Sequence, residues 1–302
     1  MAKKKILLYN RTWDMKENEE YNFPIIDGFD ITTEHRYFDE AVAVIFHMPT
    51  LLEKDSILDK RKKKKDQLWV FWSMECERHY QWQYKPEIYQ LFDIKATYKL
   101  DSDVPVPYLG PNYLELLRNE PAPKKELINA FISSAFNQSN RLDYLKQLMS
   151  YVDVHSYGKQ FNNKPLIDDA GKDTKETIIS QYKFTVAFEN AIDKDYVTEK
   201  FYDPLIAGSI PIYLGAPNIE ELAPGEHCFI NVHAFPSVKA LADYLKHLDA
   251  DENAYQEYMR WKKRPFKDQF MKMVATVDKP PLVSLCNVIL KKAKIKPIGS
   301  IN

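Results

Sequence analysis

KFTVAFENAIDKDYVTEKFYDPLIAGSIPIYLGA, residues 183–216, contains two short apolar runs with an amphipathic stretch between them. The outer runs, 183–190 and 209–216, are rich in β-branched and aromatic residues, which is typical of buried strands. The middle stretch, 195–208, predicts a loop that leads into a helix. A strand, a helix and a second strand in this order indicate a parallel sheet, so the segment predicts a protein of the α/β class.

The same alternation extends along the chain in both directions. Strands are predicted where short apolar runs recur, at 5–10, 41–48, 68–74, 94–100, 127–133, 152–158 and 228–232. Helices are predicted where apolar residues recur at helical spacing, at 51–65, 86–92, 140–151, 218–224, 237–248, 253–264 and 280–294. We therefore expect parallel sheets covered by helices on both faces.

Five prolines lie between residues 105 and 123, and they predict a linker between two domains. The expected domains are residues 1–115 and 124–275. Residues 276–302 are expected to form a C-terminal helix and tail that packs back across the first domain. Two successive α/β halves of this kind place a ligand cleft between them, near the carboxyl ends of their strands.

The composition is that of a soluble globular chain: of 302 residues, 45% are hydrophobic and 28% are charged. The net charge of −1 gives no reason to expect a nucleic acid as partner. No uncharged apolar run approaches the roughly 18 residues that a membrane span needs, so we expect at most peripheral membrane contact. The basic block 61–66 is interpreted first as a solvated helix end and second as a patch for a membrane surface or an anion.

The three cysteines, Cys76, Cys228 and Cys286, are odd in number and lack metal-type spacing. They favour a reducing compartment, without a disulfide framework. The first ten residues are too poor in apolar side chains for a signal peptide. We therefore expect a cytoplasmic protein, although an anchor upstream of this sequence would leave no trace in it.

Several common catalytic signatures are absent: the sequence has no GxGxxG, GxxxxGK[ST], GxSxG or HExxH motif. No DxD triplet ends a predicted strand, which weakens any scheme in which carboxylates hold a cation for a nucleotide diphosphate. His155 is interpreted as an ordinary residue at a strand end, and His227 and His233 lack a third partner for a metal. We therefore expect no metal site.

The residues that open the central helix allow two interpretations. In the simpler one, Thr198 caps the helix, Glu199 lies near the positive end of its dipole and Lys200 is solvated. In the other, the free N–H groups of the helix end attract an anion, and Lys200 adds a positive charge there. Arg141, at the start of an earlier helix, adds a second. Two such cations could hold a diphosphate leaving group, while Glu199 faces sugar hydroxyls or positive charge that develops on a sugar ring.

In the first half of the chain, the apolar run 68–74 leads into Glu75, Cys76 and Glu77. A carboxylate at the carboxyl end of a parallel strand projects into the ligand cleft, where it can deprotonate a hydroxyl as a general base. Glu75 is the first candidate and Glu77 the reserve, and both could also be ordinary loop carboxylates. The aromatic residues nearby suit either a core or the apolar face of a sugar; they are Trp69, Trp72, Trp82 and Tyr84.

Residues 183–224 resemble the donor-binding motif of family-10 glycosyltransferases, the α-1,3/4-fucosyltransferases. The elements FEN, DYVTEKF, AGSIPI and GAPNIEE-x-AP occur in order and without gaps. Other pieces that fit the family are WSMEC, LDSDVPVPY, FISSAFNQSNRLDYLKQL and VDVHSYG. The resemblance thus covers roughly residues 65–262, and the first 60 residues are uninformative.

The resemblance implies a GT-B fold with two Rossmann-like domains, an inverting mechanism and GDP-β-L-fucose as the donor. It places the general base on Glu75, although Cys76 and Glu77 stand where the family has Ser-Pro. It places the diphosphate-binding arginine on Arg141. The other donor-site residues that it implies are Asn190, Tyr196, Glu199 and Lys200, with Tyr157 as a further nucleotide contact.

The expected function is therefore an inverting α-1,3-fucosyltransferase that moves fucose to O3 of a GlcNAc or Glc unit in an oligosaccharide such as LacNAc. No cofactor is required, although divalent cations could stimulate transfer. Without the membrane anchor of eukaryotic members, a bacterial cytoplasmic enzyme is expected. Two alternatives stay open: a GT-B enzyme that uses another nucleotide sugar, and a catalytically silent glycan-binding relative. The acceptor, the choice of O3 over O4 and the oligomeric state are also open.

Overall fold

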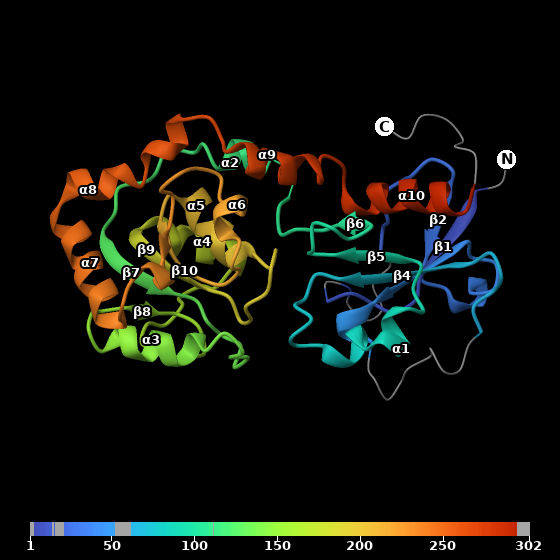
Figure 1. Ribbon diagram of the computed structural model, residues 1–302, viewed down its shortest axis with the longest axis horizontal. Coiled ribbons are helices and arrows are strands. Elements are labelled where there is room, and N and C mark those ends of the chain that lie inside the picture. The colour runs from blue at the N-terminus through green and yellow to red at the C-terminus, as the bar shows by residue number, and fades with distance from the viewer. Residues whose placement is uncertain (1–2, 14, 16–20, 52–61, 111, 295–302) are drawn as a thin grey trace. The chain divides into compact units, whose positions relative to one another are not determined.

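The computed structural model describes most of the chain, namely residues 3–13, 15, 21–51, 62–110 and 112–294. The chain divides into two compact units. One comprises Met1–Pro107 with Thr276–Asn302, and the other comprises Tyr108–Ala275. Each unit contains one parallel β-sheet with helices packed on it (Figure 1). The predicted α/β class with two parallel-sheet halves is confirmed.

The first unit contains a six-stranded sheet in the order β2-β1-β3-β4-β5-β6, and all neighbouring strands are parallel. The strands are β1 (Lys4–Leu8), β2 (Phe29–Thr32), β3 (Ala43–His47), β4 (Leu68–Ser73), β5 (Ile94–Thr97) and β6 (Val104–Pro105). The helices are α1 (Pro86–Tyr89) and α10 (Pro281–Lys292). In the described part of this unit, 3₁₀ turns lie at His35–Tyr37, Met48–Thr50 and Gln81–Tyr84.

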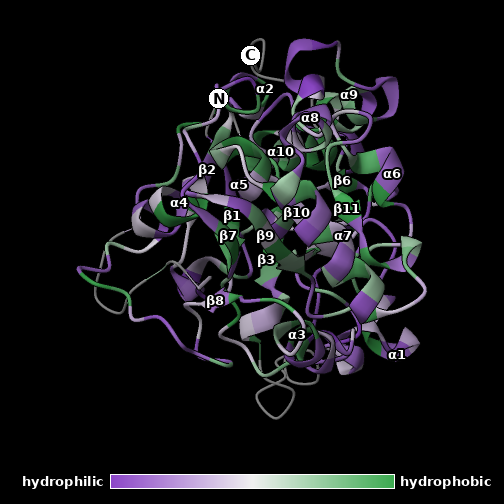
Figure 2. Cartoon of the chain, turned by 90° about the vertical axis from the view of Figure 1, so that its left-hand side faces the viewer, coloured by the Kyte–Doolittle hydropathy of each residue, from purple (hydrophilic) through white to green (hydrophobic). Residues whose placement is uncertain are grey.

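Alternate residues of these strands fill two different cores, because successive side chains point to opposite faces of a sheet. On one face, Ile45 and Val70 belong to a hydrophobic cluster with α10. On the other face, Phe46 and Phe71 pack in an aromatic cluster. The α10 residues in the first cluster are fully buried; they are Leu285, Cys286 and Ile289. The predicted packing of the final helix on the first domain is therefore confirmed, and Figure 2 shows hydrophobic stretches along this helix.

The helix predicted over 51–65 lies largely outside the described residues. Residues 62–66, at the end of the basic block, form an irregular segment and a turn rather than a helix end. Lys63 lies 2.5 Å from the carboxylate of Asp93, and Lys64 lies 3.5 Å from that of Asp39. Acidic neighbours from elsewhere in the unit thus neutralise part of the block.

The second unit contains a five-stranded parallel sheet in the order β11-β10-β9-β7-β8. The strands are β7 (Glu126–Ala130), β8 (His155–Ser156), β9 (Tyr182–Phe188), β10 (Ile210–Leu214) and β11 (Ile230–Asn231). The helices are α2 (Tyr113–Leu116), α3 (Arg141–Met149), α4 (Lys172–Ser180), α5 (Glu199–Ala207), α6 (Ile219–Leu222), α7 (Val238–Ala250), α8 (Glu252–Glu257) and α9 (Asp268–Ala275). Two 3₁₀ turns lie at Val232–Ala234 and Arg260–Lys263.

The order of the strands in the second sheet locates its ligand-binding edge. β8 lies on one side of β7 and the next strand, β9, lies on the other, so the chain changes its direction across the sheet between β7 and β9. The loops that follow these two strands therefore diverge at the carboxyl edge, and open α/β sheets bind ligands at such a switch point. α3 and α7 cover one face of the sheet, and α4 and α5 pack together against β9 (Figure 1).

Two predicted boundaries differ in the structure. The passage 101–123, predicted as a linker, contains the short strand β6 and the helix α2. The helix predicted over 253–264 is divided into α8 and a 3₁₀ turn. Tyr255, Tyr258 and Trp261 are all buried at a spacing of three residues. A 3₁₀ turn aligns side chains at this spacing, which explains why the second part winds more tightly than an α-helix.

Gly158, in the turn after β8, is expected to tolerate no side chain. A Cβ at this position would overlap the backbone of Ile132, so the chain would have to shift. We expect Gly158→Ala to lower the free energy of unfolding by about 3 kcal/mol, as overpacking does, measured by urea denaturation. Gly171→Ala is the matched control: its φ of 72° is strained for alanine, but no atom lies within 4 Å of the new Cβ. A loss of about 1 kcal/mol is expected there.

Candidate active site

The start of α5 combines a helix cap with a charged pair. Thr198 is extended, and its Oγ1 accepts a hydrogen bond from the backbone N–H of Lys200 at 3.3 Å. The predicted N-cap is therefore confirmed. Lys200 is more than a solvated side chain: its Nζ donates to Glu199 Oε1 at 3.0 Å and to Thr198 Oγ1 at 3.1 Å. Its side chain keeps 23% exposure, so it can still reach a ligand.

Arg141 joins the two strand ends at the switch point. It begins α3 and is only 1% exposed. Its Nη1 donates to the carbonyl of Phe188, the last residue of β9, at 3.2 Å. Its Nη2 donates to the carbonyl of Ser134, in the loop after β7, at 2.9 Å. Its Nε is buried and has no hydrogen-bond partner among the described residues, so this N–H can donate to a further acceptor.

Lys200 lies between two carboxylates, Glu199 and Glu189, whose oxygens are 3.0 Å and 3.7 Å from its Nζ. Burial acts to lower the pKa of Lys200, but these two negative charges outweigh it and the pKa is raised. Burial acts to raise the pKa of Glu199, but the charges of Lys200 and Lys175 outweigh it and the pKa is lowered. Both groups are therefore charged at neutral pH.

The loop between β9 and α5 contains two more of the predicted residues. Asn190 follows the strand, and its Oδ1 is buried without a hydrogen-bond partner in the described part of the chain. Tyr196 is 1% exposed, and its ring contacts Tyr108 edge to face with centroids 6.2 Å apart. Tyr196 is thus mainly a packed residue of the loop, and Asn190 has an acceptor to offer.

Tyr157 lies at the carboxyl end of β8, next to the same edge of the sheet. Its hydroxyl is 2.8 Å from that of Tyr182, and its ring stacks on Phe131 with centroids 5.1 Å apart. Phe131 also lines a narrow crevice together with Lys200. Tyr157 opens on a cavity of about 470 Å³, whose other lining residues are Pro165, Ile167, Asp173, Thr174, Thr177 and Ile178.

The second unit therefore brings its six predicted residues to one edge of one sheet. Arg141 is close enough to Lys200 for the two positive charges to oppose each other. Burial lowers the pKa of Arg141, and the negative charges of Glu189 and Glu199 act in the opposite direction. Tyr157 is more remote and is connected to Lys200 through Phe131.

Glu75, in the first unit, follows the carboxyl end of β4, as predicted. Burial, and then the charge of Glu75, raise the pKa of the Tyr80 hydroxyl, so the carboxylate lies near that ring. The reserve candidate, Glu77, is in an ion pair: its Oε2 is 2.7 Å from Nζ of Lys99.

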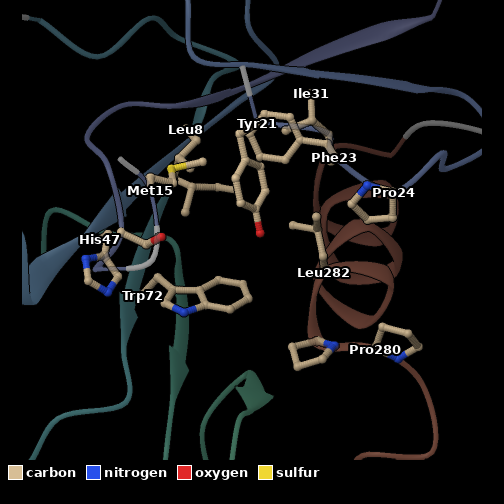
Figure 3. Close-up of a pocket in the computed structure, with 13 residues that line it drawn as sticks. Leu8, Met15, Tyr21, Phe23, Pro24, Ile31, His47, Trp72, Pro280 and Leu282 are labelled. Carbon is tan, nitrogen blue, oxygen red and sulfur yellow. The ribbon is translucent and has the colours of Figure 1, made fainter. Parts of the chain in front are cut away.

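A pocket of about 280 Å³ lies within the first unit, at the carboxyl ends of β1, β3 and β4. Trp72 at the end of β4 and Leu282 of α10 line it, and the Tyr21 hydroxyl points toward the space between them (Figure 3). The other lining residues are mostly apolar; they are Leu8, Thr12, Met15, Phe23, Pro24, Ile31, Ile45, His47, Pro280 and Pro281. Trp72 precedes Glu75 by three residues, so the apolar wall and the carboxylate belong to one strand end.

Sequence reasoning missed one charged residue of the second site. Glu189 is fully buried, and its carboxylate accepts hydrogen bonds from Thr198 N at 2.7 Å and Thr198 Oγ1 at 2.9 Å. The FEN element contained it, but an acidic residue at the end of an apolar run gives no sign of its burial. Burial raises its pKa to about 7, with Lys200 acting in the opposite direction.

Arg141 and Lys200 form a cationic cluster at the carboxyl edge of the second sheet. Two parallel-sheet units with such a cluster are typical of glycosyltransferases of the GT-B class. The sequence comparison is more specific. A family described as glycosyltransferase family 10 (fucosyltransferase), C-terminal, matches residues 121–302, and one described as fucosyltransferase, N-terminal, matches residues 1–109. The chain belongs to this family, as the resemblance predicted.

Similar proteins agree with this assignment. The chain is 33% identical over 248 residues to 4-galactosyl-N-acetylglucosaminide 3-alpha-L-fucosyltransferase 9 of Mus musculus, and 32% identical over 248 residues to the Homo sapiens protein of that name. Each match covers 79% of this chain and 65% of the relative, so the chain spans less than two thirds of these relatives.

Solved structures share the fold. A crystal structure of an alpha1,3-fucosyltransferase with GDP-fucose matches 95% of this chain and 90% of that one, with a TM-score of 0.59 and 20% identity. A second structure of an alpha1,3-fucosyltransferase matches 94% of this chain and 89% of that one, with a TM-score of 0.62 and 20% identity. The predicted GT-B fold is confirmed. No helix in the described ranges is long and apolar enough to cross a membrane.

Proposed function

We propose that the protein is an inverting α-1,3-fucosyltransferase that moves L-fucose from GDP-β-L-fucose to O3 of a GlcNAc or Glc unit in an oligosaccharide such as LacNAc. The observation that carries this proposal is that two positively charged side chains, Arg141 and Lys200, lie close enough to repel each other at the switch point of the second sheet. Membership of the fucosyltransferase family and the names of the relatives support it.

Lys200 and Arg141 are the groups proposed to hold the diphosphate. The Nζ of Lys200 lies at the N-terminal end of a nine-residue helix, where backbone N–H groups also favour an anion. The buried Nε of Arg141 offers a hydrogen bond that the protein does not use. Glu199, ionised beside Lys200, is proposed to accept from sugar hydroxyls or to face positive charge on the fucose ring. Asn190 contributes its buried Oδ1 to the donor.

Two further residues of the second unit are proposed to help bind the sugar nucleotide, away from its diphosphate. Tyr157 is proposed to contact the nucleotide, because its ring stands over the 470 Å³ cavity beside the sheet edge. Tyr196 is proposed to act through the loop that it packs, since only 1% of its surface is exposed.

The first unit is proposed to receive the acceptor. Glu75 is the general base, and the pocket at Trp72 offers an aromatic wall for the apolar face of a sugar ring. Glu75 removes the proton from the acceptor hydroxyl as that oxygen attacks C1 of fucose opposite the diphosphate. The new C–O bond forms while the bond from C1 to the β-phosphate oxygen breaks, so the electron pair leaves with GDP. The configuration at C1 changes from β to α.

The proposed reaction requires no metal, because Arg141 and Lys200 compensate the charge of the departing GDP. Divalent cations could still stimulate it. All three cysteines are buried and free, which supports a reducing compartment such as the bacterial cytoplasm.

The experiment that tests the proposal is GDP release from GDP-fucose with a panel of LacNAc, lactose, type-1 and core N-glycan acceptors, in the presence of EDTA. We expect release that depends on an acceptor and continues in EDTA. Thermal shift with other nucleotide sugars is the control, and GDP-fucose should stabilise the protein most. Stabilisation by GDP-fucose without release would indicate a different acceptor or a silent relative, and stabilisation by another nucleotide sugar alone would contradict the donor.

A further inference from the structure

Glu189 is a buried carboxyl group that the proposed reaction does not use. It directly follows β9, it is 0% exposed, and both of its oxygens accept hydrogen bonds from Thr198. A Cβ on Gly215 would come within 2.7 Å of its Cγ. The group is therefore held in place and has no space in which to turn away from its neighbours.

The charged and titratable groups that face Glu189 come from three elements packed around it. The nearest is Lys200, whose Nζ lies 3.7 Å from Oε2. Among the described residues, those with an electrostatic interaction with Glu189 include Lys200, Glu199 and Tyr202 of α5, Arg141 of α3 and Tyr213 of β10. The two tyrosines are neutral because burial raises the pKa of each well above its ordinary value.

The charge of this cluster depends on Glu189. With Glu189 ionised, its charge and that of Glu199 balance those of Arg141 and Lys200, and the cluster is neutral. With Glu189 protonated, the cluster carries one positive charge. Burial raises the pKa of Glu189 to about 7, so both states are populated at neutral pH.

We propose that Glu189 takes up a proton when the diphosphate of the sugar nucleotide binds, and that it thereby sets the pH dependence of donor affinity. This inference rests on the proposed donor site at Lys200 and Arg141. Glu189 is a positioning residue in this scheme: it touches Thr198 and neighbours Lys200, and it makes no contact with the reacting atoms.

The physical reason is competition for one ammonium group. Ionised Glu189 attracts Lys200 and repels the phosphates, whereas protonated Glu189 does neither. The donor therefore binds the protonated form more tightly, and by linkage its binding raises the pKa of Glu189 further. Below about pH 6 the group is already protonated and affinity is constant. Above about pH 7 affinity falls as the pH rises, by at most about tenfold per unit.

The test is isothermal titration of the protein with GDP-fucose between pH 5.5 and 8.5. GDP-fucose is suitable because each of its phosphates carries one ester and one anhydride bond and keeps a single strongly acidic oxygen, so its charge is constant over this range. Near pH 7.5, measurement in two buffers of different ionisation enthalpy gives the number of protons taken up, expected to be on the order of half a proton or more. The wild type should also bind progressively more weakly above pH 7.

Three variants identify the residue that takes up the proton when GDP-fucose binds. Glu189→Gln should bind GDP-fucose with an affinity independent of pH and without proton uptake, and more tightly than the wild type at pH 8.5. Glu189→Asp retains a carboxyl group and should retain a pH dependence. His155→Gln is the matched control: it removes an ionisable side chain of β8, whose Nδ1 lies 2.7 Å from the Tyr182 hydroxyl, and it should make no difference.

The outcomes separate the inference from the proposed function. If GDP-fucose does not bind to the wild type at any pH, the donor site and the inference are both overturned. If it binds with no proton uptake at pH 7.5, or if uptake persists in Glu189→Gln or disappears in His155→Gln, only the inference is overturned. Because the uptake is measured on the wild type, the test stands even where a variant does not fold.

Discussion

Glu75→Gln is expected to lose fucosyl transfer by about 10²- to 10⁴-fold, the contribution of a positioned general base. Gln keeps the shape of the side chain but cannot accept the acceptor proton. Because Glu75 belongs to the first unit and the cationic cluster to the second, the dissociation constant of GDP-fucose should be unchanged. Initial rates with a saturating acceptor, together with titration calorimetry of the donor, measure the two effects separately.

Glu77→Gln is the matched control, since it is the neighbouring carboxylate and is paired with Lys99 at 2.7 Å. It should retain transfer within a few-fold, with a small loss of stability from an ion pair that is partly exposed. Loss of transfer in Glu77→Gln and not in Glu75→Gln would assign the base to Glu77. Full transfer in both variants would place the base elsewhere.

Lys200→Met is expected to weaken GDP-fucose binding by about 10- to 150-fold, the equivalent of the roughly 1.5–3 kcal/mol that a hydrogen bond to a charged group contributes. Methionine fills the space of the aliphatic chain and removes only the ammonium group, which lies 3.0 Å from Glu199 and 3.7 Å from Glu189. Glu199 then lacks its nearest cation and repels the diphosphate as well. Titration calorimetry at pH 7 measures the change.

Lys239→Met controls for the loss of a positive charge in general. Lys239 lies on α7, is 63% exposed and, among the residues that the structure describes, forms an ion pair only with Asp243 of the same helix. Its replacement should leave donor affinity unchanged and stability within about 0.5 kcal/mol. Equal donor affinity of Lys200→Met and the wild type would contradict the assignment of Lys200 to the diphosphate.

The apolar runs of the sequence predicted most strands of the two sheets correctly. The runs 68–74 and 209–216 are long, apolar and bounded by turn residues, and they form β4 and β10. The edge strand β2 went unpredicted because only its first residue, Phe29, is buried, which leaves no periodic pattern. The two-residue strand β6 went unpredicted because it lies at the start of the proline-rich passage. Their place in the sheet depends on pairing with distant neighbours, which a local pattern does not contain.

The sequence by itself determined the parallel α/β architecture, the family and the start of α5 at Thr198, because each depends on residues close together in the chain. Only the tertiary structure decided the electrostatics of the site. Arg141 is 47 residues from the carbonyl of Phe188 that it binds, and the crossing of β9 past β7 brings them together. The same crossing buries Glu189 beside Lys200. The pKa of Glu189 depends on its burial and on the charges around it in three dimensions, so the spacing of residues along the sequence could not indicate it.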